Sequence, residues 1–170
     1  MDTMRLVRTN LRVSRSGFGA LPIQRISFDE AKAILRKPYH NGIHFFDTAR
    51  AYTNSEEKIG YALADVRNDI ILATKSKAGD RKTLLKDLET SLRNLKTDHV
   101  DILQLHNPAE LPDPEDPESS YAGLLEARQK GLIRFLGLTN HKIGNALQAA
   151  ASARYDTVQF PLNSLSAAAD

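Results

Sequence analysis

The sequence predicts an α/β fold in which short buried strands alternate with amphipathic helices around a parallel sheet. Apolar runs of strand length recur along the 170-residue chain, and each is followed by a longer segment with helical periodicity. The strands are nearly continuous apolar runs, which is typical of a parallel sheet covered on both faces. The glycine fingerprint G-x-G-x-x-G does not follow the first strand, which weakens the case for a doubly wound dinucleotide-binding sheet.

The elements follow one another in a regular order. Six strands are expected, at 18–23, 43–48, 69–76, 99–106, 133–140 and 157–162. Helices are expected between them, at 27–37, 55–66, 80–96, 119–131 and 143–154, and residues 164–170 resemble the start of another helix. This alternation predicts consecutive βα units within one domain that spans residues 1–170.

Local signals support the helix assignments. Ser27 and Glu30 form a capping box at the start of the first helix, and Pro38 should end or kink that helix. Ser55 is expected to be the N-cap of the second helix, and Gly131 is expected just after the end of the fourth. Buried apolar stripes are expected at Ala31, Ile34 and Leu35 in the first helix and at Leu84, Leu88, Leu92 and Leu95 in the third.

Composition narrows the classes of function. Lys and Arg number 23 against 21 Asp and Glu, and the resulting net charge of +2 gives no reason to expect a nucleic-acid or membrane partner. No apolar run is long enough to cross a membrane, and no secretory signal is visible at the N-terminus, so we expect a cytoplasmic location. The chain has no Cys, which excludes disulfides, iron–sulfur clusters and thiolate chemistry, and no metal site is expected.

Reactive side chains stand where the apolar strands end. In "HFFDTARAY", residues 44 to 52, a strand stops at Asp47 and Tyr52 follows, while the next two strands end at Lys75 and His106. The C-terminal strand ends of a parallel barrel lie on one face, so these four side chains should converge. A phenol titrates near pH ~10, and a neighbouring ammonium held by a carboxylate would lower its pKa. The set therefore predicts a general acid that protonates a carbonyl oxygen.

Each of these residues also has a plainer interpretation when it is taken alone. Asp47 could cap a turn, Lys75 could be a solvated surface residue, and His106 could be a structural histidine. A different barrel enzyme, such as an aldolase that forms a Schiff base on Lys75, is a further alternative.

Longer stretches of the chain resemble a known family. "GIHFFDTARAYTNSEEKIGYAL" is similar to the signature of the aldo-keto reductases, and "LETSLRNLKTDHVDILQLHNP", "GLIRFLGLTNH" and "VQFPLN" resemble later segments of that family in the same order. The resemblance implies a (β/α)8 barrel of the TIM type, which reduces aldehydes or ketones with NADPH or NADH.

The resemblance also implies roles for individual residues. Tyr52 would be the general acid, Lys75 and Asp47 would tune it, and His106 would orient a small carbonyl substrate. Residues expected to contact the cofactor are Gly19, Asp47, Thr139, Asn140 and Gln159, of which Thr139, Asn140 and Gln159 would bind the nicotinamide carboxamide.

The chain departs from the family pattern in several places. A barrel of this class typically needs about 250 residues, so about six of the eight βα units are expected here. The first and sixth strands would then be open edges, which leads to the hypothesis of self-association, and a catalytically silent binding or structural fragment is the alternative to an active reductase. Thr53 replaces the usual Gly, so the loop that carries Tyr52 is expected to be displaced, because β-branched residues resist positive φ.

Overall fold

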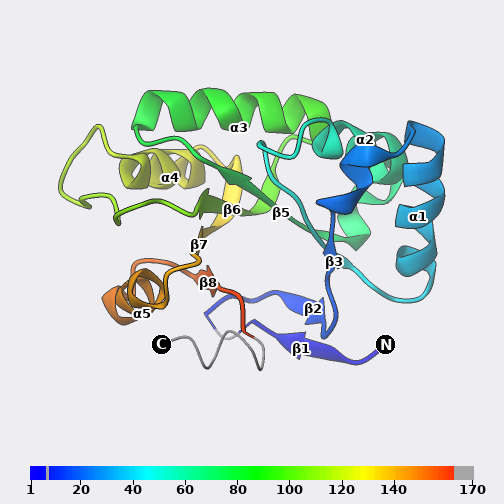
Figure 1. The fold of residues 1–170 in the computed structure, drawn as a ribbon, viewed down its shortest axis with the longest axis horizontal. Coiled ribbons are helices and arrows are strands. Elements are labelled where there is room, and N and C mark those ends of the chain that lie inside the picture. The colour runs from blue at the N-terminus through cyan, green and yellow to red at the C-terminus, as the bar shows by residue number, and fades with distance from the viewer. Residues whose placement is uncertain (7, 163–170) are drawn as a thin grey trace.

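A curved sheet of six parallel strands forms the centre of the computed structural model, which describes residues 1–6 and 8–162 (Figure 1). The strands are β3 (Phe18–Gly19), β4 (Phe45–Asp47), β5 (Ile71–Ser76), β6 (Val100–His106), β7 (Ile133–Thr139) and β8 (Thr157–Gln159). Each strand pairs with the next one along the chain, in the order β3-β4-β5-β6-β7-β8. The expected incomplete (β/α)8 barrel with six of its strands is confirmed, and the domain limits 1–170 stay a prediction.

Five helices cover the outer side of this sheet in the described part of the chain (Figure 1). They are α1 (Phe28–His40), α2 (Ser55–Leu63), α3 (Arg81–Leu95), α4 (Ser120–Gln129) and α5 (Ile143–Ser152), with short 3-10 helices at Pro22–Arg25 and Ala64–Asp69. Within the described ranges, no helix is both long and apolar enough to cross a membrane. The helix expected to begin at 164–170 lies outside the described residues.

The strands divide the apolar side chains between two clusters because neighbouring residues of a strand point to opposite faces. Phe46, Leu72 and Leu103 face the helices and belong to the larger cluster. Ala73 and Ile102 point into the barrel and belong to the smaller one. Each fully buried aliphatic side chain contributes about 1.5–3 kcal/mol, so the layer between sheet and helices supplies most of the hydrophobic stabilisation.

An N-terminal hairpin that the sequence pattern did not indicate covers the N-terminal end of the barrel. It consists of β1 (Thr3–Arg5) and β2 (Arg12–Ser14), which pair antiparallel. Leu11 and Val13 are buried in the inner cluster beside Ala73 and Ile102, so the hairpin packs on residues that face the barrel interior.

Helix α1 begins as expected and ends later than expected. Both hydrogen bonds of the capping box are present: the Ser27 side chain accepts from the Glu30 backbone N–H, and the Glu30 side chain accepts from the Ser27 backbone N–H. Pro38 lies inside the helix, which continues to His40, because a proline in the last turn removes only one backbone hydrogen bond. Ile34 does not join the buried stripe, since its side chain is 45% exposed on the outer face.

Two further expectations need correction. The run at 18–23 forms a strand only over β3, and from Pro22 onward the backbone turns into a 3-10 helix. Ser55 is the first residue of α2 and not its N-cap, which is Asn54. The Ser55 hydroxyl donates instead to the Ala20 carbonyl at 2.9 Å and lies 2.8 Å from Thr48 Oγ1, so it ties the helix start to the strand ends.

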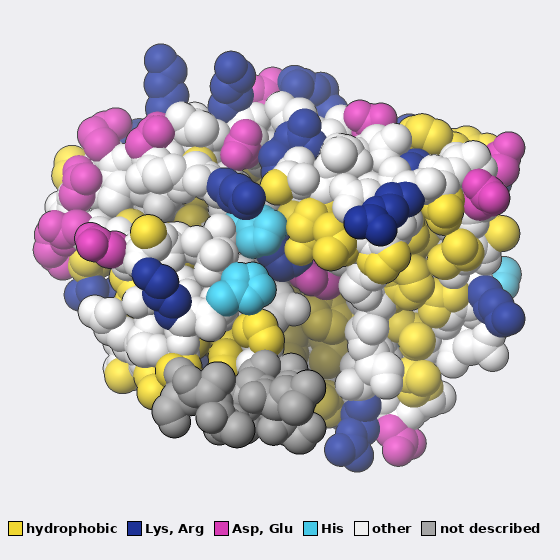
Figure 2. All heavy atoms as spheres, in the orientation of Figure 1, with side chains coloured by type: hydrophobic (Ala, Val, Ile, Leu, Met, Phe, Trp, Pro, Cys, Tyr) yellow, Lys and Arg dark blue, Asp and Glu magenta, His cyan; other side chains and the backbone are white. Residues whose placement is uncertain are grey.

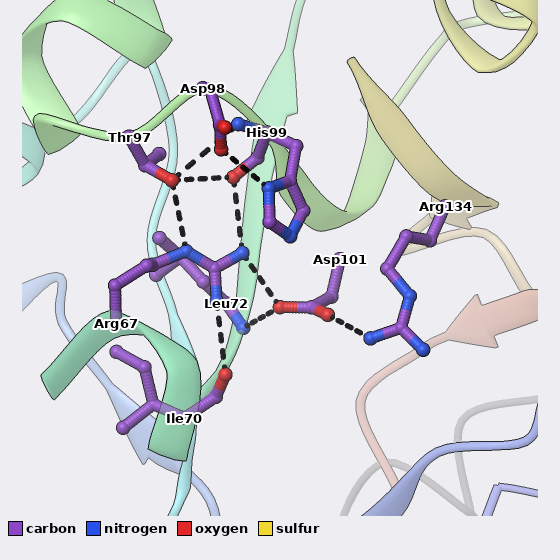
Figure 3. A network of polar contacts seen from close by, with 8 residues as sticks. All are labelled: Arg67, Ile70, Leu72, Thr97, Asp98, His99, Asp101 and Arg134. Carbon is purple, nitrogen blue, oxygen red and sulfur yellow. Dashed lines mark hydrogen bonds and ion pairs between the residues drawn. The ribbon is translucent and has the colours of Figure 1, made fainter. Parts of the chain in front are cut away.

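A polar network centred on Asp101 fastens the N-terminal ends of three strands (Figure 3). Asp101 is 1% exposed and accepts hydrogen bonds on both carboxylate oxygens. Oδ2 accepts from Arg67 Nη2 and from the Leu72 backbone, both at 2.9 Å, and Oδ1 accepts from Arg134 Nη1 at 2.7 Å. The network lies at the N-terminal ends of the strands, whereas the active sites of such barrels lie at the C-terminal ends. We therefore infer that it stabilises the fold.

Replacing Asp101 by Ala should destabilise the fold strongly. The change leaves Arg67 without its carboxylate in a largely buried position, and removing one partner of a buried pair typically costs about 3–5 kcal/mol. Urea unfolding measures the loss, with Asp98→Ala as the matched control because the Asp98 side chain is 94% exposed. Equal stabilities of the two variants would contradict the assignment.

Candidate active site

The C-terminal ends of the strands surround one cavity of about 210 Å³. Figure 2 shows histidine side chains near the middle of this face, beside a hollowed region. Residues from five strands or the loops after them line the cavity: Asp47, Tyr52, Lys75, His106, Thr139, Asn140, His141, Gln159, Phe160 and Pro161. Of the predicted site residues, all but Gly19 therefore meet at one place. Gly19 pairs with Asp47 on the neighbouring strand, and no atom lies within 4 Å of the position a Cβ would take there.

A buried ion pair lies in the wall of this cavity. Lys75 is 3% exposed, and its Nζ donates to Asp47 Oδ2 at 2.6 Å and to the Thr48 carbonyl at 2.7 Å. Burial lowers the pKa of Lys75, and the charge and hydrogen bond of Asp47 oppose that change. Both short hydrogen bonds direct Nζ toward protein oxygens rather than toward a carbonyl carbon, which disfavours the Schiff-base alternative.

The second oxygen of the Asp47 carboxylate has a partner that the sequence pattern does not predict. Gln104 Nε2 donates to Asp47 Oδ1 at 3.0 Å. Gln104 is the one polar residue in the run Ile102 to Leu105 of β6, and a polar side chain inside a buried apolar strand needs a hydrogen-bond partner. That pattern was the available signal, but the identity of the partner depends on strand register.

Tyr52 packs on two other members of the site. Its ring meets the His106 ring edge-on, with centroids 5.7 Å apart at an interplanar angle of 84°. Lys75 Nζ lies 5.4 Å from the Tyr52 ring centroid. Burial, followed by the negative charge of Asp47, raises the pKa of Tyr52, whereas the sequence pattern predicts that the ammonium lowers it. That expectation is wrong for this arrangement, because burial and the negative charge of Asp47 outweigh any lowering of the pKa by the ammonium.

The loop that carries Tyr52 keeps its place despite Thr53. Thr53 adopts the positive φ of 42° that a Gly would take more easily. Backbone hydrogen bonds hold the turn, with Tyr52 N donating to the Ala49 carbonyl at 3.0 Å and Ser55 N donating to the Tyr52 carbonyl at 2.8 Å. The expected displacement of Tyr52 away from the site is therefore not found, and the strain is borne by Thr53.

His106 is an uncharged imidazole at neutral pH. Burial, followed by the positive charges of Lys75 and Lys77 and the proximity of His141, lowers the pKa of His106 to about 4. Its Nδ1 is buried without a hydrogen-bond partner among the described residues. A neutral imidazole carries one N–H donor and one acceptor, so His106 can donate a hydrogen bond without adding charge.

The three residues expected to hold a carboxamide differ in availability. Asn140 already uses both ends of its amide, since Nδ2 donates to the Pro108 carbonyl and Oδ1 accepts from Lys142 N, each at 2.8 Å. Gln159 is exposed at the cavity wall and makes no side-chain hydrogen bond to another described residue. Thr139 lines the same wall. Gln159 and Thr139 are thus the freer groups, and Asn140 chiefly holds the loop after β6.

The cavity fits the reactive end of a dinucleotide better than the whole molecule. Ordinary ligand pockets have volumes of about 300–1,000 Å³, and this cavity is smaller. Polar side chains, among them Thr139 and Gln159, line its wall. No group of three or more His, Asp or Glu side chains suited to a metal ion occurs in the described part of the chain.

Comparison with known sequences gives consistent matches. A sequence model of the Aldo/keto reductase family matches residues 16–169. The aldo-keto reductase YhdN of Bacillus subtilis (strain 168) is 31% identical over 183 residues, covering 96% of this chain and 54% of that protein. L-galactose dehydrogenase of Arabidopsis thaliana is 34% identical over 149 residues, covering 79% of this chain and 47% of that protein. The chain spans about half the length of these curated relatives.

Solved structures agree with the sequence matches. The thermostable aldo-keto reductase Tm1743, in complex with the inhibitor epalrestat, superposes with a TM-score of 0.81 at 28% identity and covers 96% of this chain and 63% of its own. The holo form of AKR11C1 from Bacillus halodurans gives a TM-score of 0.80 at 27% identity, covering 95% and 58%. Since the family model matches nearly all of the chain and a relative above 30% identity covers almost its full length, this protein belongs to the aldo/keto reductase family.

Proposed function

We propose that this chain carries the proton-transfer centre of a carbonyl reductase, in which Tyr52 protonates the oxygen of an aldehyde or ketone. The observation that carries the proposal is the meeting of Tyr52, His106 and the buried Lys75–Asp47 pair around one cavity. NADPH or NADH is the proposed cofactor, on the strength of family membership and the fit of the cavity. When bound, its dihydronicotinamide would supply the hydride that reduces the carbonyl carbon.

The protonation states support this division of roles. Tyr52 is protonated at neutral pH, which is the form a general acid needs, although its raised pKa by itself makes proton donation harder. As the proton leaves, negative charge develops on the phenol oxygen, and Lys75 is the nearby cation that can stabilise it. Asp47 opposes the effect of burial and so favours the charged form of Lys75.

The remaining wall of the cavity suits substrate and cofactor positioning. His106, being neutral, would donate a hydrogen bond to the carbonyl oxygen without competing as an acid. Thr139 and Gln159 would bind the carboxamide, with Asn140 supporting the loop beside them. The open space beside Gly19 would admit the rest of the cofactor. The cytoplasmic location expected from composition stays a prediction.

A catalytically silent binding fragment is the second candidate, and one observation favours it. Among the described residues, β3 and β8 are edge strands, because each pairs with a neighbour on one side only. A cavity of about 370 Å³ also lies beside the edge strand β8, between Phe45, Ile102 and Val158. Unpaired strand edges promote association. The hypothesis of self-association predicts a sedimentation coefficient that rises with concentration, and a monomer at every concentration would count against it.

Replacing Tyr52 by Phe should abolish most of the reductase activity and leave cofactor binding intact. Loss of a general acid typically lowers the rate by about 10²- to 10⁴-fold, while the ring and its packing on His106 are kept. NAD(P)H-dependent reduction of an aldehyde panel measures the rate, and quenching or enhancement of cofactor fluorescence measures binding. Tyr61→Phe is the control, because Tyr61 lies on the exposed face of α2. Retention of full activity in Tyr52→Phe would contradict the proposal.

His106 should stay neutral down to about pH 4. Its pKa is lowered to about 4 from an ordinary value near 6.5, so the unfolded chain binds the proton first as the pH falls. The folded state therefore loses stability between about pH 6.5 and pH 4, and none of this loss is present above pH 6.5. NMR titration of the imidazole, assigned with His106→Asn, gives the midpoint. A midpoint near 6.5 would show that His106 is solvated and would remove its proposed role.

A further inference from the structure

Gln104 is a buried polar residue to which the proposed chemistry gives no role. It lies at the middle of β6, is 4% exposed, and pairs in register with Lys75 on β5. Its Nε2 donates to Asp47 Oδ1 at 3.0 Å, while Asp47 Oδ2 accepts from Lys75 at 2.6 Å. The carboxylate of Asp47 is therefore held at both oxygens, by an amide on one side and an ammonium on the other.

Space for the Gln104 side chain is provided by Gly137 on the next strand. Gly137 pairs with Gln104 in register, and a Cβ at position 137 would lie 2.7 Å from Gln104 Cγ and 2.7 Å from Thr157 Oγ1. Such distances are too short for real contacts, so any side chain at 137 would push Gln104 out of place. The φ angle of Gly137 is not positive, so space and not backbone conformation calls for glycine here.

We propose that Gln104 is a positioning residue, which fixes the Asp47 carboxylate against Lys75 and so sets the ammonium beside Tyr52. This inference rests on the proposed reductase function. Without the amide donor, Asp47 Oδ1 would face the cavity with no partner, and the carboxylate could rotate away from Lys75. Lys75 would then keep only the Thr48 carbonyl, and the charge that assists proton transfer from Tyr52 would no longer be fixed.

The alternative is that Gln104 simply fills the barrel interior. The two explanations differ in what a substitution of similar size does. Filling requires volume alone, whereas positioning requires a hydrogen-bond donor directed at Asp47. Gln104→Leu keeps most of the volume and removes the donor. Gln104→Glu keeps the shape, and its carboxyl can donate only when it is protonated.

The kinetic test compares these two variants across a range of pH. Gln104→Leu should lower kcat by about 10- to 100-fold, as expected for the loss of a hydrogen bond to a charged group, with the cofactor affinity unchanged. Gln104→Glu should lose activity at neutral pH, where two carboxylates would face each other, and should recover toward wild type as the pH falls. Thr157→Val is the control, because Thr157 Oγ1 has no hydrogen-bond partner in the described ranges and lines the same part of the interior. Wild-type activity in Gln104→Leu, an equal loss in Thr157→Val, or no recovery of Gln104→Glu at low pH would overturn the proposal.

A second measurement does not need any turnover. The ¹⁵Nζ signal of the Lys75 ammonium, assigned with Lys75→Met, should be protected from solvent exchange in the wild-type chain and should exchange faster in Gln104→Leu. An unchanged exchange rate would overturn the positioning role even if the chain is an active reductase. Failure of the proposed function would show differently, as an absence of NAD(P)H-dependent reduction by the wild-type chain while the Lys75 signal still responds to Gln104→Leu.

Discussion

The ion pair between Lys75 and Asp47 is the interaction on which the candidate site depends. Adjacent strands lie about 4.8 Å apart, and residues two positions apart on a strand share a face. Asp47 pairs in register with Ala73, so Lys75, two residues further on, points to the same side and reaches the carboxylate. Burying two charges costs several kcal/mol per ion before their attraction is counted. A pair kept in the wall of a cavity, where Tyr52 and His106 meet it, is therefore better explained by chemistry than by stability.

The two ends of the barrel use buried carboxylates for different purposes. Asp101, near the N-terminal ends of the strands, is held by two arginines and a backbone amide. Asp47, at the opposite end, is held by one ammonium and one neutral amide and lines an open cavity. The first arrangement locks three strands together. The second leaves a single cation next to a phenol, which is an arrangement that can respond to charge developing during a reaction.

Much of this arrangement could be predicted from the order of apolar runs, and the failures have physical causes. The ends of the apolar runs predicted that Asp47, Lys75 and His106 lie close together, because the C-terminal ends of parallel strands lie on the same face of a barrel. The hairpin of β1 and β2 was missed, since strands of three residues carry too little alternation to be seen. The pKa of Tyr52 depends on its burial and on the nearby charge of Asp47, which sequence spacing does not contain. The contact of Gln104 with Asp47 depends on strand register and on the space left by Gly137.

We propose that these residues assemble a site for hydride transfer to a carbonyl. Two samples of NADPH, deuterated on one or the other face of the dihydronicotinamide, test this in reactions of the wild-type chain with an aldehyde. We expect deuterium on the carbinol carbon from one sample only, because a cofactor held by fixed side chains presents a single face. Deuterium transfer from neither sample would mean that the chain does not carry out the reaction, and equal transfer from both would mean that no ordered cofactor site exists.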